Sequence, residues 1–278
     1  MCGYCIVKTE EMAERDRAME RDEKSKIKVQ GLHYSIDSKE ILKNVDFQIE
    51  EGRTVGIIGP NGSGKTTTLK HIYRALEPQR ETVYIDGRDI HQLSYKEAAQ
   101  EITVMKQENA SDFEYTIYEM VMMGRTPHRN LFQADTKEDK EVVRNALRYV
   151  GMEKEAERYY TELSGGEKQR VMIARSLAQG TEIFILDEPT NHLDVHYQWA
   201  LMEIIKSLQK TVVAVFHELN LAAAYCEEIF VMKDGSIVAH GSPREVLTKE
   251  MLAEVFRIDA DIIEKENGQI YIVYNRSL

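Results

Sequence analysis

A glycine-rich stretch in the first quarter of the chain contains the residue types that bind phosphate groups. It reads Gly59-Pro-Asn-Gly-Ser-Gly-Lys65-Thr66, between the short apolar run 55–58 and the helix-compatible segment 67–76. Glycines let successive backbone N–H groups turn toward one point, and a helix N-terminus adds unpaired donors and partial positive charge. Lys65 is suited to the β- and γ-phosphates of a nucleotide, and the Thr66 hydroxyl to Mg²⁺. The order of strand, turn and helix favours a nucleotide-binding loop over an ordinary tight turn.

Two carboxylates follow a second apolar run, at residues 183–186. They are Asp187 and Glu188. In an open α/β sheet the carboxyl ends of the strands face the ligand crevice, so both side chains are predicted to lie near the phosphate loop. Asp187 fits the Mg²⁺ shell, and Glu188 is placed to polarise a water that attacks the γ-phosphate. The alternative, a pair of helix-capping acids, leaves an apolar strand that ends in two acids unexplained.

A third stretch, Leu163-Ser-Gly-Gly-Glu167, precedes a segment with helical periodicity at 168–178. Ser164 and the two glycines offer a hydroxyl and accessible N–H groups at a helix start, which suits a second anion site. An ordinary serine N-cap explains the same residues, and taken singly they favour that interpretation.

The composition restricts the class of protein. The chain has 278 residues and a net charge of −11, which argues against a nucleic-acid binder because such proteins usually present a basic face. No run approaches 18 apolar residues, and the N-terminus lacks a signal-peptide pattern. The three cysteines, Cys2, Cys5 and Cys226, form no disulfide framework. Together these features predict a cytoplasmic protein with no membrane span.

The elements that position these residues are predicted from hydrophobic periodicity. Alternating strands from Ile27 onward indicate an antiparallel sheet at the edge of an α/β core, and the runs 183–186 and 212–216 indicate central parallel strands. A helical pattern over 115–161 predicts an inserted helical subdomain, assigned to about 108–168. We expect a charged extension at 1–26, one domain at 27–258 and a tail at 259–278, with a hairpin near 229–239, a helix at 243–256 and a last strand at 269–273.

The motifs resemble, in content and in order, those of the ATPase subunits of ABC transporters over about residues 27–256. The matching segments are the phosphate loop from Gly59 to Thr67, the glutamine loop at Gln107, the signature Leu163-Ser-Gly-Gly-Glu167, the strand and acids at 183–188, the aspartate loop Asn191-His-Leu-Asp194 and the switch histidine His217. The resemblance implies an α/β fold, a P-loop NTPase (RecA-like) core with an antiparallel β subdomain and an inserted α-helical subdomain.

The resemblance also implies cofactors and roles, with ATP and Mg²⁺ as the bound species. The implied catalytic residues are Glu188 as general base, His217, Gln107 and Lys65, and the implied metal ligands are Thr66, Gln107 and Asp187. The implied nucleotide contacts are Tyr34 (stacked on adenine), Gly59, Asn61, Gly62, Ser63, Gly64, Lys65, Thr66, Thr67, Ser164, Gly165, Gly166 and Asp194. Ser164 and Gly166 would contact ATP held by a second copy, so the expected active form is a head-to-tail homodimer.

Two passages resemble a particular group within the family. Residues 116–128 and 216–226 are similar to stretches of importer ATPases that serve iron-siderophore, haem and cobalamin permeases. We therefore expect ATP hydrolysis that powers import of a metal chelate, on the inner face of the cell membrane and docked to integral membrane permease subunits. The alternatives are a soluble ABC ATPase, for example of Fe–S assembly, and an ABC ATPase for another transported substrate. A catalytically silent subunit is disfavoured by the intact Lys65, Glu188 and His217.

Three features depart from the family pattern. Glu167 stands where glutamine is commoner in the signature, and this variant is expected to preserve function. Glu81 stands where the family usually turns on glycine, which leaves the conformation of the loop 78–82 open. The extension 1–26 has no counterpart in the family pattern.

Overall fold

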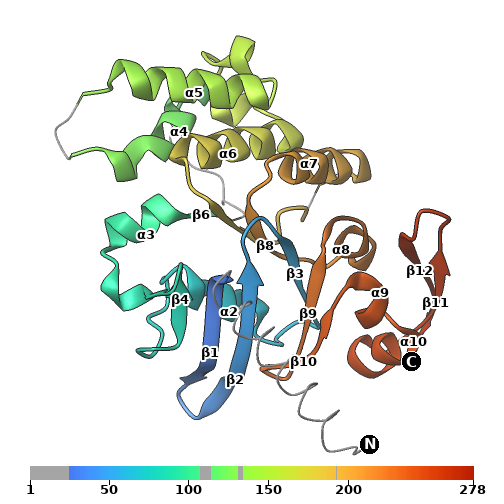
Figure 1. The fold of residues 1–278 in the computed structure, drawn as a ribbon. Helices are drawn as coiled ribbons and strands as arrows, with labels where there is room; N and C mark the ends of the chain where they lie inside the picture. Colours follow the sequence, from blue (N-terminus) through green and yellow to red (C-terminus); the bar gives the residue numbers. More distant parts are fainter. Residues whose placement is uncertain (1–24, 107–113, 131–133, 192) are drawn as a thin grey trace, which may run out of the picture.

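The computed structural model describes residues 25–106, 114–130, 134–191 and 193–278, and Figure 1 shows its layers. Gln107, most of the extension 1–26, and with it Cys2 and Cys5, lie outside the described residues. Among the helices of the described ranges, none is both long and apolar enough to cross a membrane.

A six-stranded sheet forms the centre of the molecule, in the order β10-β9-β3-β8-β7-β6. Its strands are β3 (Thr54–Ile58), β6 (Ile102–Lys106), β7 (Ile183–Asp187), β8 (Thr211–Val215), β9 (Glu228–Lys233) and β10 (Ser236–Gly241). All neighbours pair in parallel except β9 and β10, which form the expected hairpin. Both predicted apolar runs are central strands buried on both faces, as parallel strands between layers require.

An antiparallel sheet covers one side of this core, as expected from the alternation after Ile27. It contains β1 (Ser25–Ile36), β2 (Lys39–Glu50), β4 (Val83–Ile85) and β5 (Arg88–Asp89), and the short helices η1 (Ile90–Gln92) and α3 (Tyr95–Glu101) follow it. Helix α2 (Lys65–Ile72) packs between the two sheets, because Leu69 and Ile72 are fully buried in one cluster with strands of both. The phosphate loop therefore lies at the junction of the two sheets.

The opposite side of the core carries the helical subdomain, at the top of Figure 1. It contains α4 (Ile117–Met122), η2 (Met123–His128), α5 (Lys137–Tyr149), η3 (Glu153–Glu155), η4 (Tyr160–Glu162) and α6 (Gly165–Gln179). Helix α6 packs against both α4 and α5 and continues past residue 168, which is about where the sequence interpretation placed the end of the subdomain; that boundary stays a prediction. Helices α7 (Val195–Ser207) and α8 (Leu219–Tyr225) complete this side of the core.

The passage Gly124-Arg125, which carried part of the importer resemblance, joins α4 to α6. A Cβ atom on Gly124 would lie 2.3 Å from the Arg175 carbonyl oxygen, so only glycine permits this close approach. The Arg125 guanidinium donates to Asp139 at 2.9 Å and to the Ala178 carbonyl at 2.8 Å. Although burial opposes ionisation, the hydrogen bonds from Arg125 and Thr136 hold the pKa of Asp139 well below its ordinary value. These residues hold the helical subdomain together.

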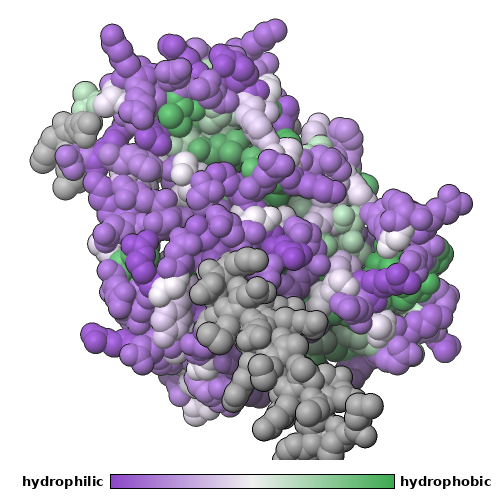
Figure 2. Space-filling view, in the orientation of Figure 1, coloured by the Kyte–Doolittle hydropathy of each residue, from purple (hydrophilic) through white to green (hydrophobic). Residues whose placement is uncertain are grey.

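The C-terminal region differs from the sequence expectation. The predicted helix at 243–256 is three short pieces, α9 (Pro243–Val246), α10 (Lys249–Met251) and the π-helical η5 (Leu252–Phe256). It breaks because Leu247 leaves helical geometry and the Thr248 hydroxyl starts a new helix by accepting from the Met251 N–H. The expected last strand is β12 (Ile270–Ser277), and it pairs with an unexpected β11 (Ile258–Glu264). Figure 2 shows hydrophobic surface over this hairpin, where Ile263 and Val273 are exposed.

Candidate functional site

The loop between β3 and α2 has the geometry of a phosphate cradle. A Cβ atom on Gly59 would lie 2.1 Å from the Met232 carbonyl oxygen, and Gly64, at φ +105°, turns the chain into α2. Both positions exclude other residues on steric grounds. The Ser63 hydroxyl is buried without a hydrogen-bond partner among the described residues. Because a buried polar atom normally has a partner, this orphaned hydroxyl fits a loop shaped for an anion.

Lys65 lies in the cradle and is only 5% exposed. Its ammonium group donates to the Gly59 carbonyl at 2.8 Å and to the Pro60 carbonyl at 3.0 Å. Burial lowers the pKa of Lys65, while Glu188 and Asp187 act in the opposite direction. A phosphate that entered the loop could take the place of the two carbonyls and return a full opposite charge to this cation.

The donor set for Mg²⁺ is formed across two elements. Thr66, in the first turn of α2, donates its hydroxyl to the Asp187 carboxylate at the end of β7 over 2.9 Å. Hard divalent cations prefer a hydroxyl and a carboxylate oxygen of this kind. Burial raises the pKa of Asp187, as does the neighbouring Glu188, so a cation bound between these oxygens would favour the charged carboxylate. Thr66 and Asp187 fit the metal; Gln107, the third predicted ligand, is outside the described residues.

Glu188 is held at both carboxylate oxygens. The His217 imidazole, just after β8, meets one oxygen at 2.6 Å, and the Asn191 side-chain amide donates to the other at 3.1 Å. The backbone of Glu188 has φ +54°, which is unfavourable for a residue with a side chain. Strain of this kind gathers at functional positions, where the surrounding structure must maintain it. The structure thus brings together Glu188 and His217, two residues that the family resemblance assigned to catalysis; their contact with each other was not predicted from the sequence.

The signature forms a complete capping box at the start of α6. Ser164 accepts the Glu167 N–H at 3.3 Å, and the Glu167 carboxylate accepts the Ser164 N–H at 2.9 Å and the Ser164 hydroxyl at 2.7 Å. These bonds, with the Ser164 hydroxyl contributing most, lower the pKa of Glu167. Since a capping box accepts either glutamate or glutamine at this position, the departure at Glu167 keeps the local structure.

A comparison with protein families identifies a match to the family model described as ABC transporter, over residues 42–191. The chain is 36% identical over 251 residues to the Iron(3+)-hydroxamate import ATP-binding protein FhuC of Bacillus subtilis, covering 88% of this chain and 93% of that protein. The chain belongs to the ABC transporter family.

Other relatives of this ABC protein carry related names. It is 37% identical to the Ferric enterobactin transport ATP-binding protein FepC of Escherichia coli, covering 81% of the chain and 84% of that protein. It is 40% identical over 232 residues to the Cobalamin import ATP-binding protein BtuD of Halobacterium salinarum, covering 82% of the chain. That alignment spans only 58% of the halobacterial protein.

Solved structures agree with the fold. A dimeric bacterial ABC transporter cassette matches with a TM-score of 0.67 at 32% identity, covering 78% of this chain and 99% of that one. An inward-facing metal-chelate type ABC transporter matches with a TM-score of 0.77 at 24% identity, covering 90% and 97%. The α/β fold and the family predicted from the motifs are therefore confirmed.

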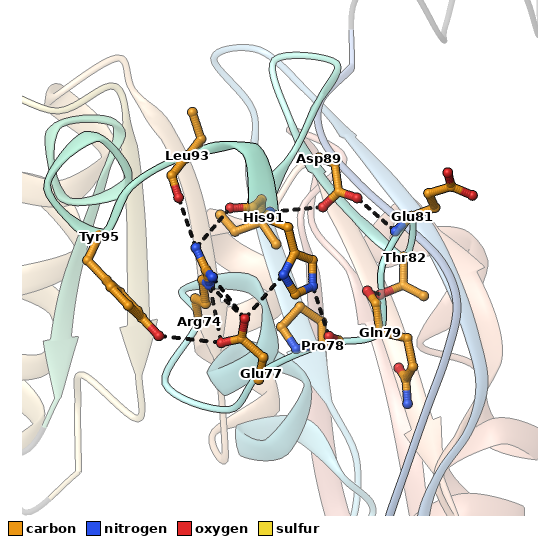
Figure 3. A network of polar contacts seen from close by, with 11 residues as sticks. Arg74, Glu77, Pro78, Gln79, Glu81, Thr82, Asp89, His91, Leu93 and Tyr95 are labelled. Atoms are coloured by element: carbon orange, nitrogen blue, oxygen red, sulfur yellow. Dashed lines mark hydrogen bonds and ion pairs between the residues drawn. The ribbon is translucent and has the colours of Figure 1, made fainter.

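The second family departure, Glu81, lies in a network of polar contacts between α2 and α3 (Figure 3). Glu81 keeps the left-handed turn, at φ +61°, and its N–H donates to the Asp89 carboxylate at 2.8 Å. Asp89 also accepts the His91 N–H, at 2.9 Å. Glu77 joins Arg74 and His91 on the other side of the network. The loop thus makes the glycine-type turn with a residue that is poorly suited to it.

Glu81→Gly is expected to raise the free energy of unfolding by about 0.5–1 kcal/mol. Relief of the left-handed conformation is worth about 1–2 kcal/mol, and the greater freedom of glycine in the unfolded chain offsets part of it. Thermal unfolding followed by calorimetry measures the change. Glu51→Gly is the matched control, because exposed Glu51 is not among the residues with positive φ, and it should lower stability. A lower melting temperature for Glu81→Gly would contradict the explanation.

The remaining residues that are predicted to contact the nucleotide lie in the phosphate loop, in α2, on β1 and at the start of α7. Asn61 and Gly62 are exposed on the loop, and Thr67 lies in the first turn of α2. Tyr34, half-buried on β1, makes an edge contact with His71 of α2 at 4.8 Å, so it lies beside the helix that follows the loop. Asp194 is the exposed N-cap residue of α7. Their contacts with nucleotide stay predictions.

Two residues near the site were not singled out from the sequence. The sequence indicated Asn191 only as part of the aspartate loop, and its hydrogen bond to Glu188 depends on the turn after β7. Lys106 ends β6 directly opposite Asp187, and its ammonium lies 4.7 Å from the centre of the Tyr73 ring. Each of the two strands is an apolar run that ends in a charged residue, and parallel neighbours end at the same edge of a sheet. The sequence could therefore have indicated that Lys106 lies close to Asp187.

Proposed function

We propose that this chain is an ATP-hydrolysing subunit that works as a head-to-tail homodimer beneath a membrane permease. The observation that carries the proposal is the arrangement of Glu188. Its carboxylate is fixed by His217 and Asn191 and directly follows Asp187, which contacts Thr66 of the phosphate loop. A base and a metal ligand therefore lie side by side next to a cradle for phosphates.

The residues support in-line transfer of the γ-phosphoryl group to water. Lys65 and the loop N–H groups bind and orient the phosphates. Thr66 and Asp187 would hold Mg²⁺, which would supply positive charge to the phosphate groups when bound. Glu188 orients the attacking water and accepts its proton, and His217 holds the carboxylate in place. The bond between the γ-phosphorus atom and the bridging oxygen breaks, and that oxygen leaves as part of ADP.

The second half of each site would come from a partner copy. Among the described residues Ser164 is hydrogen-bonded to Glu167 and, through its carbonyl, to the Lys168 N–H of α6, so in one chain it makes no such contact with the phosphate loop. Ser164 lies exposed at the N-terminus of α6, a helix of 15 residues whose dipole favours an anion. A two-fold dimer would place this end against the ATP of the other copy.

Mixing two inactive variants tests the shared site. Ser164→Arg chains keep Glu188 but lose the signature, and Glu188→Gln chains keep the signature but lose the base. A mixed dimer contains one complete site, so the mixture should hydrolyse ATP while each variant alone is nearly inactive. Ser164→Arg mixed with the double variant Ser164→Arg/Glu188→Gln is the control without a complete site. A mixture no faster than this control would contradict the dimer.

We also infer that the chain powers import of a metal chelate of the iron-siderophore, haem or cobalamin type. The names of the relatives supply this inference, since they describe import of iron(3+)-hydroxamate and of cobalamin, and transport of ferric enterobactin, by those proteins. Permease subunits are the expected partners, and the inner face of the cell membrane is the expected location, where ATP is available.

A further inference from the structure

The second glycine of the signature is covered by an aromatic ring. Gly166 is buried, although its neighbours Ser164 and Gly165 are exposed. A Cβ atom on Gly166 would lie 2.5–2.8 Å from three ring atoms of Tyr197, which is closer than real Cβ atoms come to a neighbour. On Gly165 the nearest atom would be a Leu193 methyl group at 3.8 Å. The contact is therefore specific to Gly166, and it accounts for a glycine at this position.

Tyr197 belongs to the first turn of α7, and this turn is tied to the aspartate loop. Asp194 is the N-cap residue of α7 and accepts the Gln198 N–H at 3.0 Å. The Gln198 side chain donates to the carbonyls of Thr190 and Leu193, at 3.2 and 3.1 Å. A displacement of the aspartate loop would therefore move the base of the Tyr197 side chain.

Besides Gly166, the Tyr197 ring makes an edge contact with the His196 ring, at 5.3 Å between ring centres. The Tyr197 residue is 39% exposed, and a cavity of about 190 Å³ lies between α6 and α7 beside it. The cavity is lined by Leu193, Ala200 and Ile204 among others. Gly166 already lines this cavity, and loss of the ring would enlarge it and remove the surface on which Gly166 rests. Because α6 begins at this point, the position of its first N–H groups depends on that surface.

We propose that Tyr197 is a positioning residue that seats the Gly166 N–H for the γ-phosphate of ATP held by a partner copy. Through the first turn of α7 it also links the signature to the aspartate loop around Asp194, so both elements meet the partner's site as one unit. This inference rests on the proposed head-to-tail dimer, because the signature acts on a nucleotide only across that interface. Tyr197 itself touches no reacting atom.

Substitutions of Tyr197 distinguish a role in positioning the Gly166 N–H from a role in the stability of the fold. Tyr197→Ala is expected to lower kcat about tenfold or more, since misplacement of a binding group by about 1 Å can cost 10²-fold. Binding of ATP to the chain's own loop, measured by fluorescence of a labelled nucleotide, should not change. Tyr197→Phe keeps the ring and should restore the rate, and Val195→Ala, on the exposed side of the same turn, is the matched control. An unchanged kcat for Tyr197→Ala would overturn the proposal.

A double variant tests the contact itself. Gly166→Ala forces a methyl group into the Tyr197 ring and should abolish most ATP hydrolysis. If the ring sets the requirement for glycine, Gly166→Ala/Tyr197→Ala relieves the collision and regains activity relative to Gly166→Ala alone. If the double variant is no more active than Gly166→Ala, the requirement for glycine comes from elsewhere and the proposal fails.

Mixed dimers then show on which nucleotide Tyr197 acts. In a mixture of Tyr197→Ala and Glu188→Gln chains, the complete site combines the loop of the first with the signature of the second, so hydrolysis should exceed that of either variant alone. If Tyr197 acts on its own chain's nucleotide, the mixture gains nothing and the proposal is overturned. The mixture of Ser164→Arg with Glu188→Gln separates the two failures: rescue there without rescue here leaves the dimer intact and removes only the role of Tyr197.

Discussion

Glu188→Gln lowers kcat for ATP hydrolysis by about 10²–10⁴-fold, the range expected for the loss of a general base, and leaves ATP binding intact. Glutamine has the size of glutamate, so its side chain can still meet His217 and Asn191 at the positions now occupied by the carboxylate oxygens. What it loses is the capacity to accept a proton from the attacking water. Steady-state release of phosphate measures the rate, and equilibrium titration measures ATP binding.

The same variant should accumulate as an ATP-bound dimer. If nucleotide holds two copies together and cleavage separates them, a chain that binds but does not cleave ATP stays in the closed state. Size-exclusion chromatography with and without Mg-ATP detects the shift from monomer to dimer. Glu182→Gln is the matched control: Glu182 precedes the same strand, pairs with Lys210 at 2.6 Å and should not affect turnover. Normal turnover by Glu188→Gln would remove Glu188 from the role of base.

Lys65→Ala weakens ATP binding by about 10²-fold and reduces hydrolysis with it, because charge-assisted hydrogen bonds of about 1.5–3 kcal/mol are lost. The ammonium group lies in the loop, bonded only to the carbonyls of Gly59 and Pro60 among the described residues, and these bonds can be exchanged for phosphate oxygens. Isothermal titration with ATP measures the affinity. Lys43→Ala, which removes an exposed lysine of β2, controls for charge, and full affinity in Lys65→Ala would contradict the phosphate-loop assignment.

The Lys65 variant also tests the transport proposal in cells. Cells that depend on this chain should take up radiolabelled iron-siderophore, haem or cobalamin when they carry the native protein, and should lose that uptake with Lys65→Ala. The Lys43→Ala chain should support normal uptake. Retention of uptake of all three cargoes in the Lys65→Ala cells would count against metal-chelate import, and a defect confined to Fe–S enzymes would favour the soluble alternative.

Much of the fold was predictable because local patterns and burial agree. The apolar runs of β7 and β8 are continuous, and a run of that kind is typical of a parallel strand covered on both faces. The antiparallel sheet was predictable from the alternation in β1 and β2, whose inner residues are buried. The C-terminal hairpin was only half predicted, because the alternation in β11 is short, from Ile258 to Ile262, and its pairing with β12 is a tertiary contact.

The sequence alone determined which residue types the proposed site contains. A lysine and a threonine at the end of a glycine-rich turn, two acids at the end of an apolar strand and a histidine after the next strand can be recognised from residue type and spacing. These features are local, because each depends on a strand end or a helix start that the neighbouring residues specify. The ordered motifs were also sufficient to predict the family.

The tertiary structure decided which of these groups meet, and how. Only the sheet order places Thr66 against Asp187 and His217 against Glu188, since both contacts join residues far apart in the chain. Only the packing of α6 on α7 brings Tyr197 over Gly166. Contacts of this kind depend on the crossing of elements and on side-chain volume, and neither leaves a periodic trace in one sequence.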